Sequence, residues 1–311
     1  MADTYTQVST LSTLVTTAYD KMIENANRSK VLFRGAVDKY LADPTHAGST
    51  YTLQIYNDLA ETSAALTEIA EPDAVAPPAN DTVNVAFAEW GRLVVRSFKL
   101  DQTSLAQVDP MILDQLARDQ AVSLDNEIKT IANAGTNVFY GGNAVSTVTV
   151  DAADVIDSDD IRAIRTFLVR KSADTVVGDL YHALVHPNQS YDLRRESAAG
   201  GWQDLHKYAA PDVFWPGVIG VYEGVFFQET PRVKVANDGA ASATNYRAIF
   251  RGRQALAEVV WKEPGTVIAE PGVVDKLSRH RAFGWHGALN WAIYRQNNLV
   301  RLETGSSIAN T

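Results

Sequence analysis

The clearest hydrophobic pattern in the chain lies between residues 109 and 135. Apolar side chains recur there at spacings of three and four, which places them on one face of an amphipathic helix. They are Leu113, Ala117, Ala121, Leu124, Ile128 and Ile131. Asp109 before Pro110 is typical of a helix start, and Gly135 suits a C-terminal cap. The pattern predicts a helix over 110–134, about 37 Å long, with a solvated opposite face made of Asp114, Arg118, Asp125, Glu127 and Lys129.

A different pattern, of alternating polar and apolar residues, occupies residues 51–56 and 83–98. Pro72, Pro77 and Pro78 separate the two stretches, and prolines punctuate strands rather than continue them. This predicts a long two-stranded arm with an irregular connector. A two-stranded ribbon is marginal in water, so the arm should lie against another element or another copy of the chain. Before it, residues 15–40 predict a helix within a Ser- and Thr-rich arm.

The second half of the chain mixes both periodicities, which indicates an α+β fold. Strands are predicted at 146–150, 181–186, 246–250, 256–261 and 266–269, and again at 281–295 and 298–303. Helices are predicted from Ser158 and over 188–196. The run PDVFWPGVIGVYEGVFFQETPR at 211–232 combines strand-forming bulk with glycines at Gly217, Gly220 and Gly224. Such a run suits packing rather than catalysis, so the function is expected to lie in surfaces.

That run, with HPNQSYDLR at 186–194 before it and DKLSR at 275–279 through FGWH at 283–286 after it, resembles tailed-phage major capsid proteins. This family has the Hong Kong-phage type of shell fold. The likeness is closer to the branch found in large podoviruses and many actinobacterial phages, and it is strongest from Asp109 to the C-terminus.

The resemblance implies five stretches in the capsid fold. They are an N-terminal arm at 1–49, an extended loop hairpin at 50–103, the spine helix with the first part of the peripheral domain at 104–157, the axial domain at 158–245, and returning strands at 246–311 that complete both domains. No long coiled segment precedes the fold, which implies a separate scaffold protein.

The resemblance also implies a function by association: copies form pentamers and hexamers of an icosahedral head that encloses double-stranded DNA. Expected partners are copies of the chain, a scaffold protein, a portal, a decoration protein and DNA contacted without sequence preference, with assembly in the bacterial cytoplasm and a final place in the virion.

Contacts between copies are expected from aromatic side chains of the hairpin, from a loop at 261–272 and from close arginine pairs, because a guanidinium gives geometric specificity toward a carboxylate. The candidates are Tyr51, Tyr56, Phe87, Trp90, Phe98, Arg194, Arg195, Trp261, Glu263, Arg279 and Arg281. A charged residue at Trp90 or Phe98 is expected to block assembly and leave the subunit soluble.

The amino-acid composition excludes or disfavours several classes of function. The chain has no cysteine, which excludes disulfides, thiolate catalysis and cysteine-ligated zinc. A formal net charge of −9 disfavours a role in coating nucleic acid, which needs clustered cations. No window reaches the roughly 18 apolar residues of a membrane helix, and the first residues lack the pattern of a signal peptide.

Motifs for catalysis are missing from the sequence. His182 and His186 sit in a strand-like apolar context without a base between them, and the acids from Asp151 to Asp160 lack the ligand order of a calcium loop. We therefore expect no enzyme activity and no cofactor. Two alternatives stay open: an encapsulin-like compartment that carries enzyme cargo, and a soluble enzyme with an unrecognised site.

Overall fold

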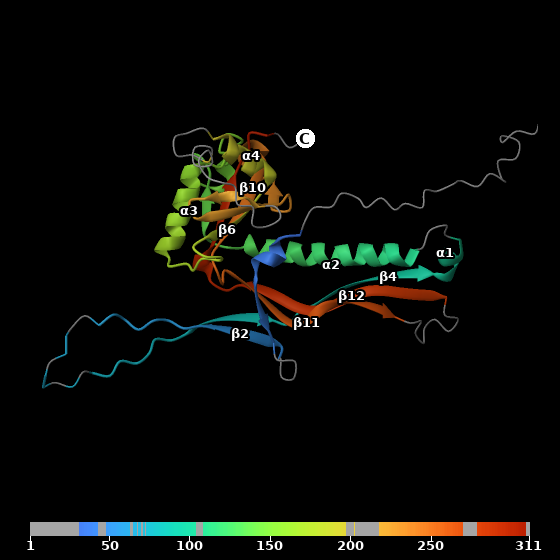
Figure 1. The fold of residues 1–311 in the computed structure, drawn as a ribbon, viewed down its shortest axis with the longest axis horizontal. Helices are drawn as coiled ribbons and strands as arrows, with labels where there is room; N and C mark the ends of the chain where they lie inside the picture. The colour runs from blue at the N-terminus through green and yellow to red at the C-terminus, as the bar shows by residue number, and fades with distance from the viewer. Residues whose placement is uncertain are drawn as a thin grey trace, which may run out of the picture.

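The computed structural model describes residues 31–42, 48–62, 65–66, 68–69, 71, 73–103, 108–196, 202, 218–269 and 279–308. Figure 1 shows a compact mixed domain at one end of a long helix, an extended sheet beneath that helix, and an arm that projects away from both. The predicted α+β class is confirmed. Most of the predicted helix at 15–40 and the first residues of the run at 211–232 lie outside the described residues.

The long helix is α2, Val108–Ala132, close to the predicted bounds. It begins before Pro110, so Asp109 lies inside the first turn, not at the cap. Its buried apolar residues are Ile112, Leu116, Leu124, Ile128 and Ala132, whereas Ala117 is exposed. The apolar stripe is therefore turned slightly from the predicted one, because the residues that meet the sheet fix the orientation of the helix.

Within the described residues, four strands form the elongated sheet under α2, in the order β1-β11-β12-β4. The strands are β1 (Asp38–Leu41), β4 (Glu89–Ser97), β11 (Leu256–Ala269) and β12 (His280–Ile293). β1 runs parallel to β11, and the other pairs are antiparallel. Helix α1 (Phe98–Thr103) follows β4 at the distal end of the sheet, far from the compact domain.

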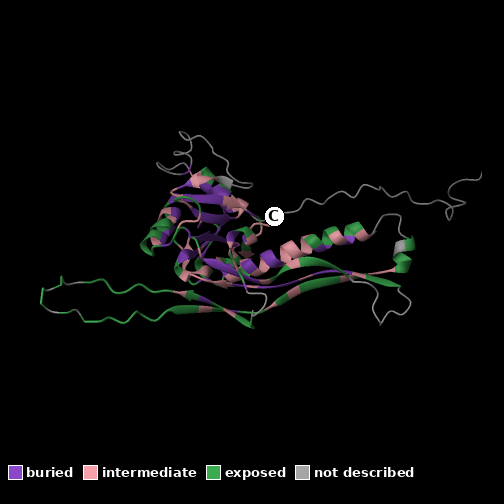
Figure 2. Cartoon of the chain, turned by 60° about the horizontal axis from the view of Figure 1, so that its bottom comes forward, coloured by how far each residue is buried: buried purple, intermediate pink, exposed green. Residues whose placement is uncertain are grey.

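The predicted arm was wrong in one respect: β4 is not part of it. The alternation over 83–98 contains two strands, and only β3 (Asp81–Ala86) pairs with β2 (Thr50–Ile55) to form the arm. β4 instead pairs with β12 along its whole length. The arm is therefore the β2–β3 ladder with its connector at 56–80, and Figure 2 shows the connector exposed along both legs.

β11 corrects two further expectations. The strands predicted at 256–261 and 266–269 are one strand, with register shifts on either side of Lys262. Pro264 lies at this irregular part, where a strand tolerates the loss of a donor. The loop expected over 261–272 is therefore strand as far as Ala269, and the rest of it lies outside the described residues.

The compact domain holds, in its described part, a seven-stranded sheet of order β5-β13-β10-β6-β8-β7, with β9 paired to β10. Its strands are β5 (Val138–Tyr140), β6 (Tyr181–Val185), β7 (Val218–Tyr222), β8 (Val225–Glu229), β9 (Lys234–Ala236), β10 (Asn245–Arg251) and β13 (Leu299–Thr304). Helices α3 (Ser158–Arg170) and α4 (Pro187–Arg195) pack beside it. The predicted helices at 158 and 188, and the buried strand at 181, are confirmed.

Short 3-10 turns complete the chain and replace two predicted elements. They are η2 (Phe33–Ala36), η3 (Thr147–Thr149), η4 (Ala240–Ser242) and η5 (Gln296–Asn298). The strand predicted at 146–150 is η3, because the Thr149 hydroxyl accepts the backbone N–H of Ser146 and closes a turn. The end of the helix predicted over 15–40 is η2 followed by strand β1.

Three separate cores hold these parts together. One lies between α2 and the elongated sheet and includes Leu124, Ile128, Trp285 and Leu289. A second fills the compact domain. The third packs Leu53 and Val85 of the arm on Ala257 and Val259 of β11. The base of the arm is therefore anchored on the sheet, and the connector beyond it has no core of its own.

Asp125 corrects the solvated face predicted for α2. Its side chain is fully buried. One carboxylate oxygen accepts the backbone N–H of Phe33 at 2.8 Å, and the other accepts Arg232 Nε at 2.8 Å. Arg232 also donates to Asn126 Oδ1 at 3.0 Å. This buried carboxylate joins the N-terminal segment, the long helix and the segment between β8 and β9.

Candidate assembly surfaces

The connector of the arm exposes apolar side chains that nothing in its own described chain covers. Ile69 is 97% exposed, and Leu66 and Val75 are each 75% exposed. Exposing such residues together is unfavourable in water. The connector is therefore a candidate contact surface for another molecule.

A second candidate surface is the outer face of the elongated sheet, which is the face opposite α2. Side chains alternate along β12: Phe283, Trp285, Leu289 and Trp291 pack toward α2, so the even-numbered residues point outward. The base of the arm covers the outer face near Ala292. Toward the distal end the outer face is open, and Leu93 and Val95 of β4 are 62% and 53% exposed there.

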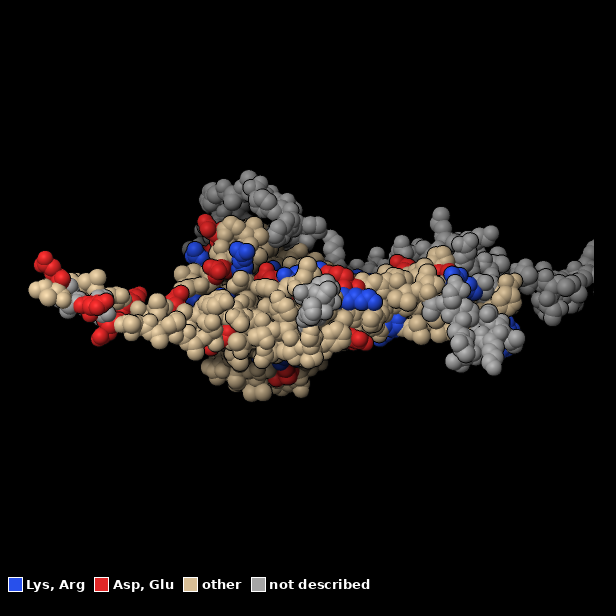
Figure 3. Space-filling model, turned by 90° about the horizontal axis from the view of Figure 1, so that it is seen from below, with Lys and Arg blue, Asp and Glu red and all other residues tan. Residues whose placement is uncertain are grey.

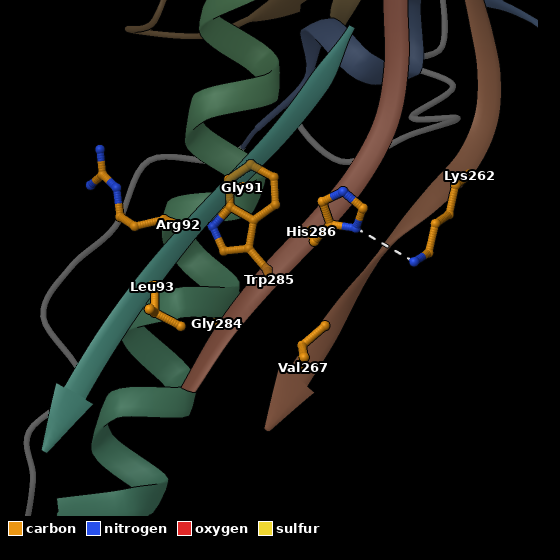
Figure 4. Close-up of a pocket in the computed structure, with 8 residues that line it drawn as sticks. All are labelled: Gly91, Arg92, Leu93, Lys262, Val267, Gly284, Trp285 and His286. Atoms are coloured by element: carbon orange, nitrogen blue, oxygen red, sulfur yellow. Dashed lines mark hydrogen bonds between the residues drawn. The ribbon is translucent and has the colours of Figure 1, made fainter. Parts of the chain in front are cut away.

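An open hollow of about 520 Å³ lies on the sheet, lined by Gly91, Arg92, Leu93, Lys262, Val267, Gly284, Trp285 and His286. Leu93, Gly284 and Val267 lie directly opposite one another on adjacent strands. A Cβ on Gly284 would lie 3.2 Å from Leu93 Cδ1, so the Leu93 side chain leans over the glycine. His286 lies one step along the sheet, and Lys262 Nζ donates to its Nδ1 at 3.4 Å (Figure 4). Both polar groups line the hollow.

The aromatic candidates from the sequence fall into two groups. Tyr51 is half-buried against the sheet, and Phe87 stacks edge-on against Trp261 with ring centroids 5.3 Å apart. Trp90 is half-buried, and its Nε1 donates to the carbonyl of Leu289 at 3.0 Å. Tyr56 and Phe98 are 74% and 59% exposed. Of these aromatic candidates, Phe87 is 41% exposed and only the last two are more than half exposed.

Trp90 also has a structural role inside the subunit, and the expectation that a charge there leaves the subunit soluble stays a prediction. Its ring packs against the core beneath α2 and lies 5.9 Å from the ring of Trp291. A charged side chain at this position would lose that packing inside the subunit.

The charged candidates have contacts within the chain. Glu263 accepts Arg34 Nη2 and Lys39 Nζ, both at 2.9 Å, and these hydrogen bonds lower its pKa against the opposing effect of burial. Arg281 Nη1 lies 3.5 Å from Asp109 Oδ2, and Arg194 Nη2 lies 3.4 Å from Glu229 Oε1. Arg195 and Arg279 are exposed. Whether any of them contacts another copy stays a prediction.

The histidine and acidic clusters have structural roles. Arg251 Nε donates to His182 Nδ1 at 3.1 Å, which leaves the His182 Nε2–H to donate to Gln228 at 3.2 Å. Burial, with the charge of Arg251 added, lowers the pKa of His182 to about 3. Asp157 caps α3 through the N–H of Asp160. Among the described residues, no group of His, Asp and Glu is arranged to hold a metal ion.

Comparison with solved structures identifies the fold. The capsid of cyanophage Pam1 matches with a TM-score of 0.77 and 16% identity, over 99% of this chain and 100% of that one. The capsid of Ralstonia phage GP4 gives 0.73 and 15%, over 99% and 100%. A chain of Mycobacterium phage Che8 gives 0.65 and 12%, over 93% and 97%. This chain has the fold of a tailed-phage capsid protein.

Sequence comparison agrees with the fold. Residues 120–273 match the family model described as phage capsid protein, a region that runs from within α2 past the end of β11. Among curated proteins, none matches the sequence. The predicted resemblance to tailed-phage capsid proteins is confirmed, and the matches support the role of a major capsid protein. In the described part of the chain, no helix combines the length and apolar character that crossing a membrane would demand.

The sequence missed the open outer face of this capsid fold. Leu93, Val95 and Val267 carry it, and none of them was a contact candidate. The alternation of β4 marks Leu93 and Val95 as sharing one face. It does not say that α2 covers the other face, because that depends on pairing with β12, about 190 positions away in the sequence.

Proposed function

We propose that this chain is the subunit of an icosahedral phage head, which assembles with copies of itself into pentamers and hexamers around double-stranded DNA. The capsid fold over the whole chain supports a shell role. The observation that carries association is the connector of the arm, whose apolar residues are exposed although the base of the arm is well packed. The exposed apolar residues of such a segment become buried only by packing against a neighbouring molecule.

The arm then lies over an adjacent subunit. If it buries about 1,000 Å² of apolar area there, the gross gain is roughly 25 kcal/mol, which exceeds an association cost of about 4–15 kcal/mol. Tyr56 and Phe98 are the contact candidates that are free to take part. The subunit acts by association and not by turnover.

Other partners follow from the same role. A separate scaffold protein guides assembly in the bacterial cytoplasm, a portal occupies one vertex, and a decoration protein binds the outside of the finished virion. DNA is contacted without sequence preference, in keeping with the net charge of −9, which limits adhesion to phosphates.

Electron microscopy of the recombinant protein, with and without a candidate scaffold protein, tests this function. Closed shells, tubes or uniform capsomers are expected, with light scattering giving their mass. A strictly monomeric particle under both conditions would contradict the proposal.

A further inference from the structure

The elongated sheet has a free edge along the distal half of β11. On the side of β11 away from β12, β1 pairs only with residues 257–260. Beyond Val260, β11 continues to Ala269 and pairs with β12 alone among the described strands. In an antiparallel strand, alternate residues direct their N–H and C=O groups to opposite sides. Every second residue of the distal half therefore directs these groups toward no described strand.

Edge strands are normally protected against pairing with other chains by lysine, proline or an irregular register. The first part of this edge has all three, because Lys262 and Pro264 lie at the register shifts of β11. Residues 265–269, GTVIA, have none of them, and we call this segment the neutral edge. The opposite edge of the sheet, β4, carries Arg92 and Arg96. Of the two edges, the neutral edge is therefore the stretch best suited to pairing.

The neutral edge exposes apolar side chains on both faces of the sheet. Ile268 pairs with Phe283, which packs toward α2, and Ile268 is 47% exposed on that face. Val267 points to the outer face, where it lines the hollow and is 46% exposed. A partner that packs on one face would leave the other face uncovered. A strand added in the plane of the sheet covers both faces and also pairs the free backbone groups.

Charge does not oppose a copy of this chain as the added strand. The formal net charge of −9 makes copies repel one another where acids meet. The neutral edge brings no charged side chain to a contact. Figure 3 views the molecule from the side of the sheet opposite α2, and the charged atoms there form small groups between uncharged areas. Two neutral edges can therefore meet without bringing acids together.

The sequence of the neutral edge also matches itself. A two-fold axis perpendicular to the sheet pairs identical strands antiparallel and keeps each side chain on its own face, so one residue faces its own copy. If Val267 takes that position, the small residues Gly265 and Ala269 face each other. The β-branched residues Thr266 and Ile268 also face each other, and such pairs stabilise a sheet. Moving the axis by one residue would place Val267 opposite a glycine or an alanine.

We propose that the neutral edges of two copies pair antiparallel about a two-fold axis, with Val267 facing the same residue of the second copy, so that the sheet continues from one subunit into the next. This rests on the proposed shell function and adds a contact that does not involve the arm. A short ladder of two strands is marginal in water. The pairing should therefore form in assemblies, where other contacts hold the copies together, and not between dilute subunits.

A disulfide tests the position of the axis. The chain has no cysteine, so Val267→Cys introduces one thiol per copy. Opposite residues in an antiparallel pair have Cα atoms about 4.5–5.5 Å apart, a separation that a disulfide spans. Mild oxidation of assemblies should therefore give covalent dimers on a non-reducing denaturing gel. Val169→Cys on α3, 56% exposed in the compact domain, is the matched control and should stay monomeric.

The register gives a second test. Thr266→Cys and Ile268→Cys would face each other and not themselves, and diagonal neighbours in a sheet are about 7–8 Å apart. That separation is too long for a disulfide, so neither variant alone should form dimers. Assemblies made from an equal mixture of the two variants should form them.

The outcomes separate the two proposals. If the unaltered chain forms no assemblies, the shell function itself fails. If Val267→Cys forms assemblies that are intact by electron microscopy but stay monomeric after oxidation, the pairing of neutral edges is overturned and the shell function stands. A strand of a different protein on this edge would give that same second result.

Opposite charges test the contact without oxidation. Val267→Asp or Val267→Lys alone places like charges opposite each other and should lower the yield of assemblies about fivefold at low salt, measured by light scattering. An equal mixture of the two variants can pair opposite charges and should recover to within about twofold of the unaltered chain. Circular dichroism checks that each variant is folded. A mixture that assembles no better than either variant alone would count against the pairing.

Discussion

At the scale of single residues, the informative positions are buried polar groups that the sequence pattern placed in solvent. Asp125 is one: an amphipathic pattern assigns any acid beside the apolar stripe to the exposed side, yet this carboxylate meets Phe33 and Arg232. Those partners lie about 90 and 107 positions away in the sequence, so local periodicity carries no signal for them. Tertiary pairing decided the burial of this residue.

Asp125→Asn should destabilise the subunit by about 3–5 kcal/mol, because Arg232 loses the buried carboxylate that neutralises it. Chemical denaturation of unassembled subunit measures the free energy of unfolding. Glu127→Gln, on the same helix, is the control and should change stability by less than about 0.5 kcal/mol. Equal effects from both variants would show that the buried junction contributes nothing special.

Asp160 gives stability a dependence on pH. Burial, together with the nearby charges of Asp157, Asp159 and Glu196, raises its pKa to about 7. A raised folded-state pKa favours the protonated folded form, so the stabilisation is complete below about pH 4 and is lost as pH rises through about 7. Asp160→Asn stays neutral and should gain about 1–3 kcal/mol over the unaltered chain at pH 8, with no gain at pH 4. If the variant and the unaltered chain differed in free energy of unfolding by the same amount at pH 4 and at pH 8, the assignment would be contradicted.

Two aromatic positions separate folding from assembly. Phe98→Glu should cost the subunit less than about 1 kcal/mol, because the ring is exposed, but it should abolish shells. Trp90→Glu should destabilise the subunit itself by about 2–4 kcal/mol, since it removes packing beneath α2 and a hydrogen bond to Leu289. Thermal unfolding and electron microscopy of both variants check this. Normal shells from Phe98→Glu would remove that residue from the contact.

At the scale of elements, the sequence predicts type well and partners poorly. The hydrophobic pattern alone predicts α2 and the buried strand β6. An apolar stripe at helical spacing indicates an amphipathic helix, and a short unbroken apolar run indicates a buried strand. The alternation over 83–98 also predicts β4 as a strand, but it assigns that strand to the arm. Alternation does not identify the partner, because the same pattern suits pairing with the arm or with β12. Pro264 divides the prediction for β11, where the structure accommodates it as an irregularity in one long strand.

The arm shows the same limit at the candidate site. Its strands and its need for a neighbour follow from the sequence, because a two-stranded ribbon does not stand alone. The outer face of the sheet cannot be predicted from the sequence. That face is assembled from β4, β11 and β12, and it is outer only because α2 covers the opposite face. Glu263 stays a predicted contact between subunits, and within its own chain it forms ion pairs with Arg34 and Lys39.

At the scale of the whole molecule, the chain is incomplete as a single copy. Its two larger cores account for the stability of the compact domain and of the helix on its sheet. The connector at one end and the open sheet face at the other take no part in either. Under the proposed shell function, such a body pairs head to tail with its copies, and contacts of this kind close into rings when the rotation permits.

The most direct test of this account compares the full chain with a variant in which residues 57–80 are replaced by a two-residue Asn-Gly turn. The β2–β3 ladder stays, so the variant should fold with an unchanged thermal midpoint. Light scattering should then give capsomers or shells for the full chain and monomers for the variant. Shells of normal mass from the shortened chain would contradict the claim that this subunit assembles through its arm.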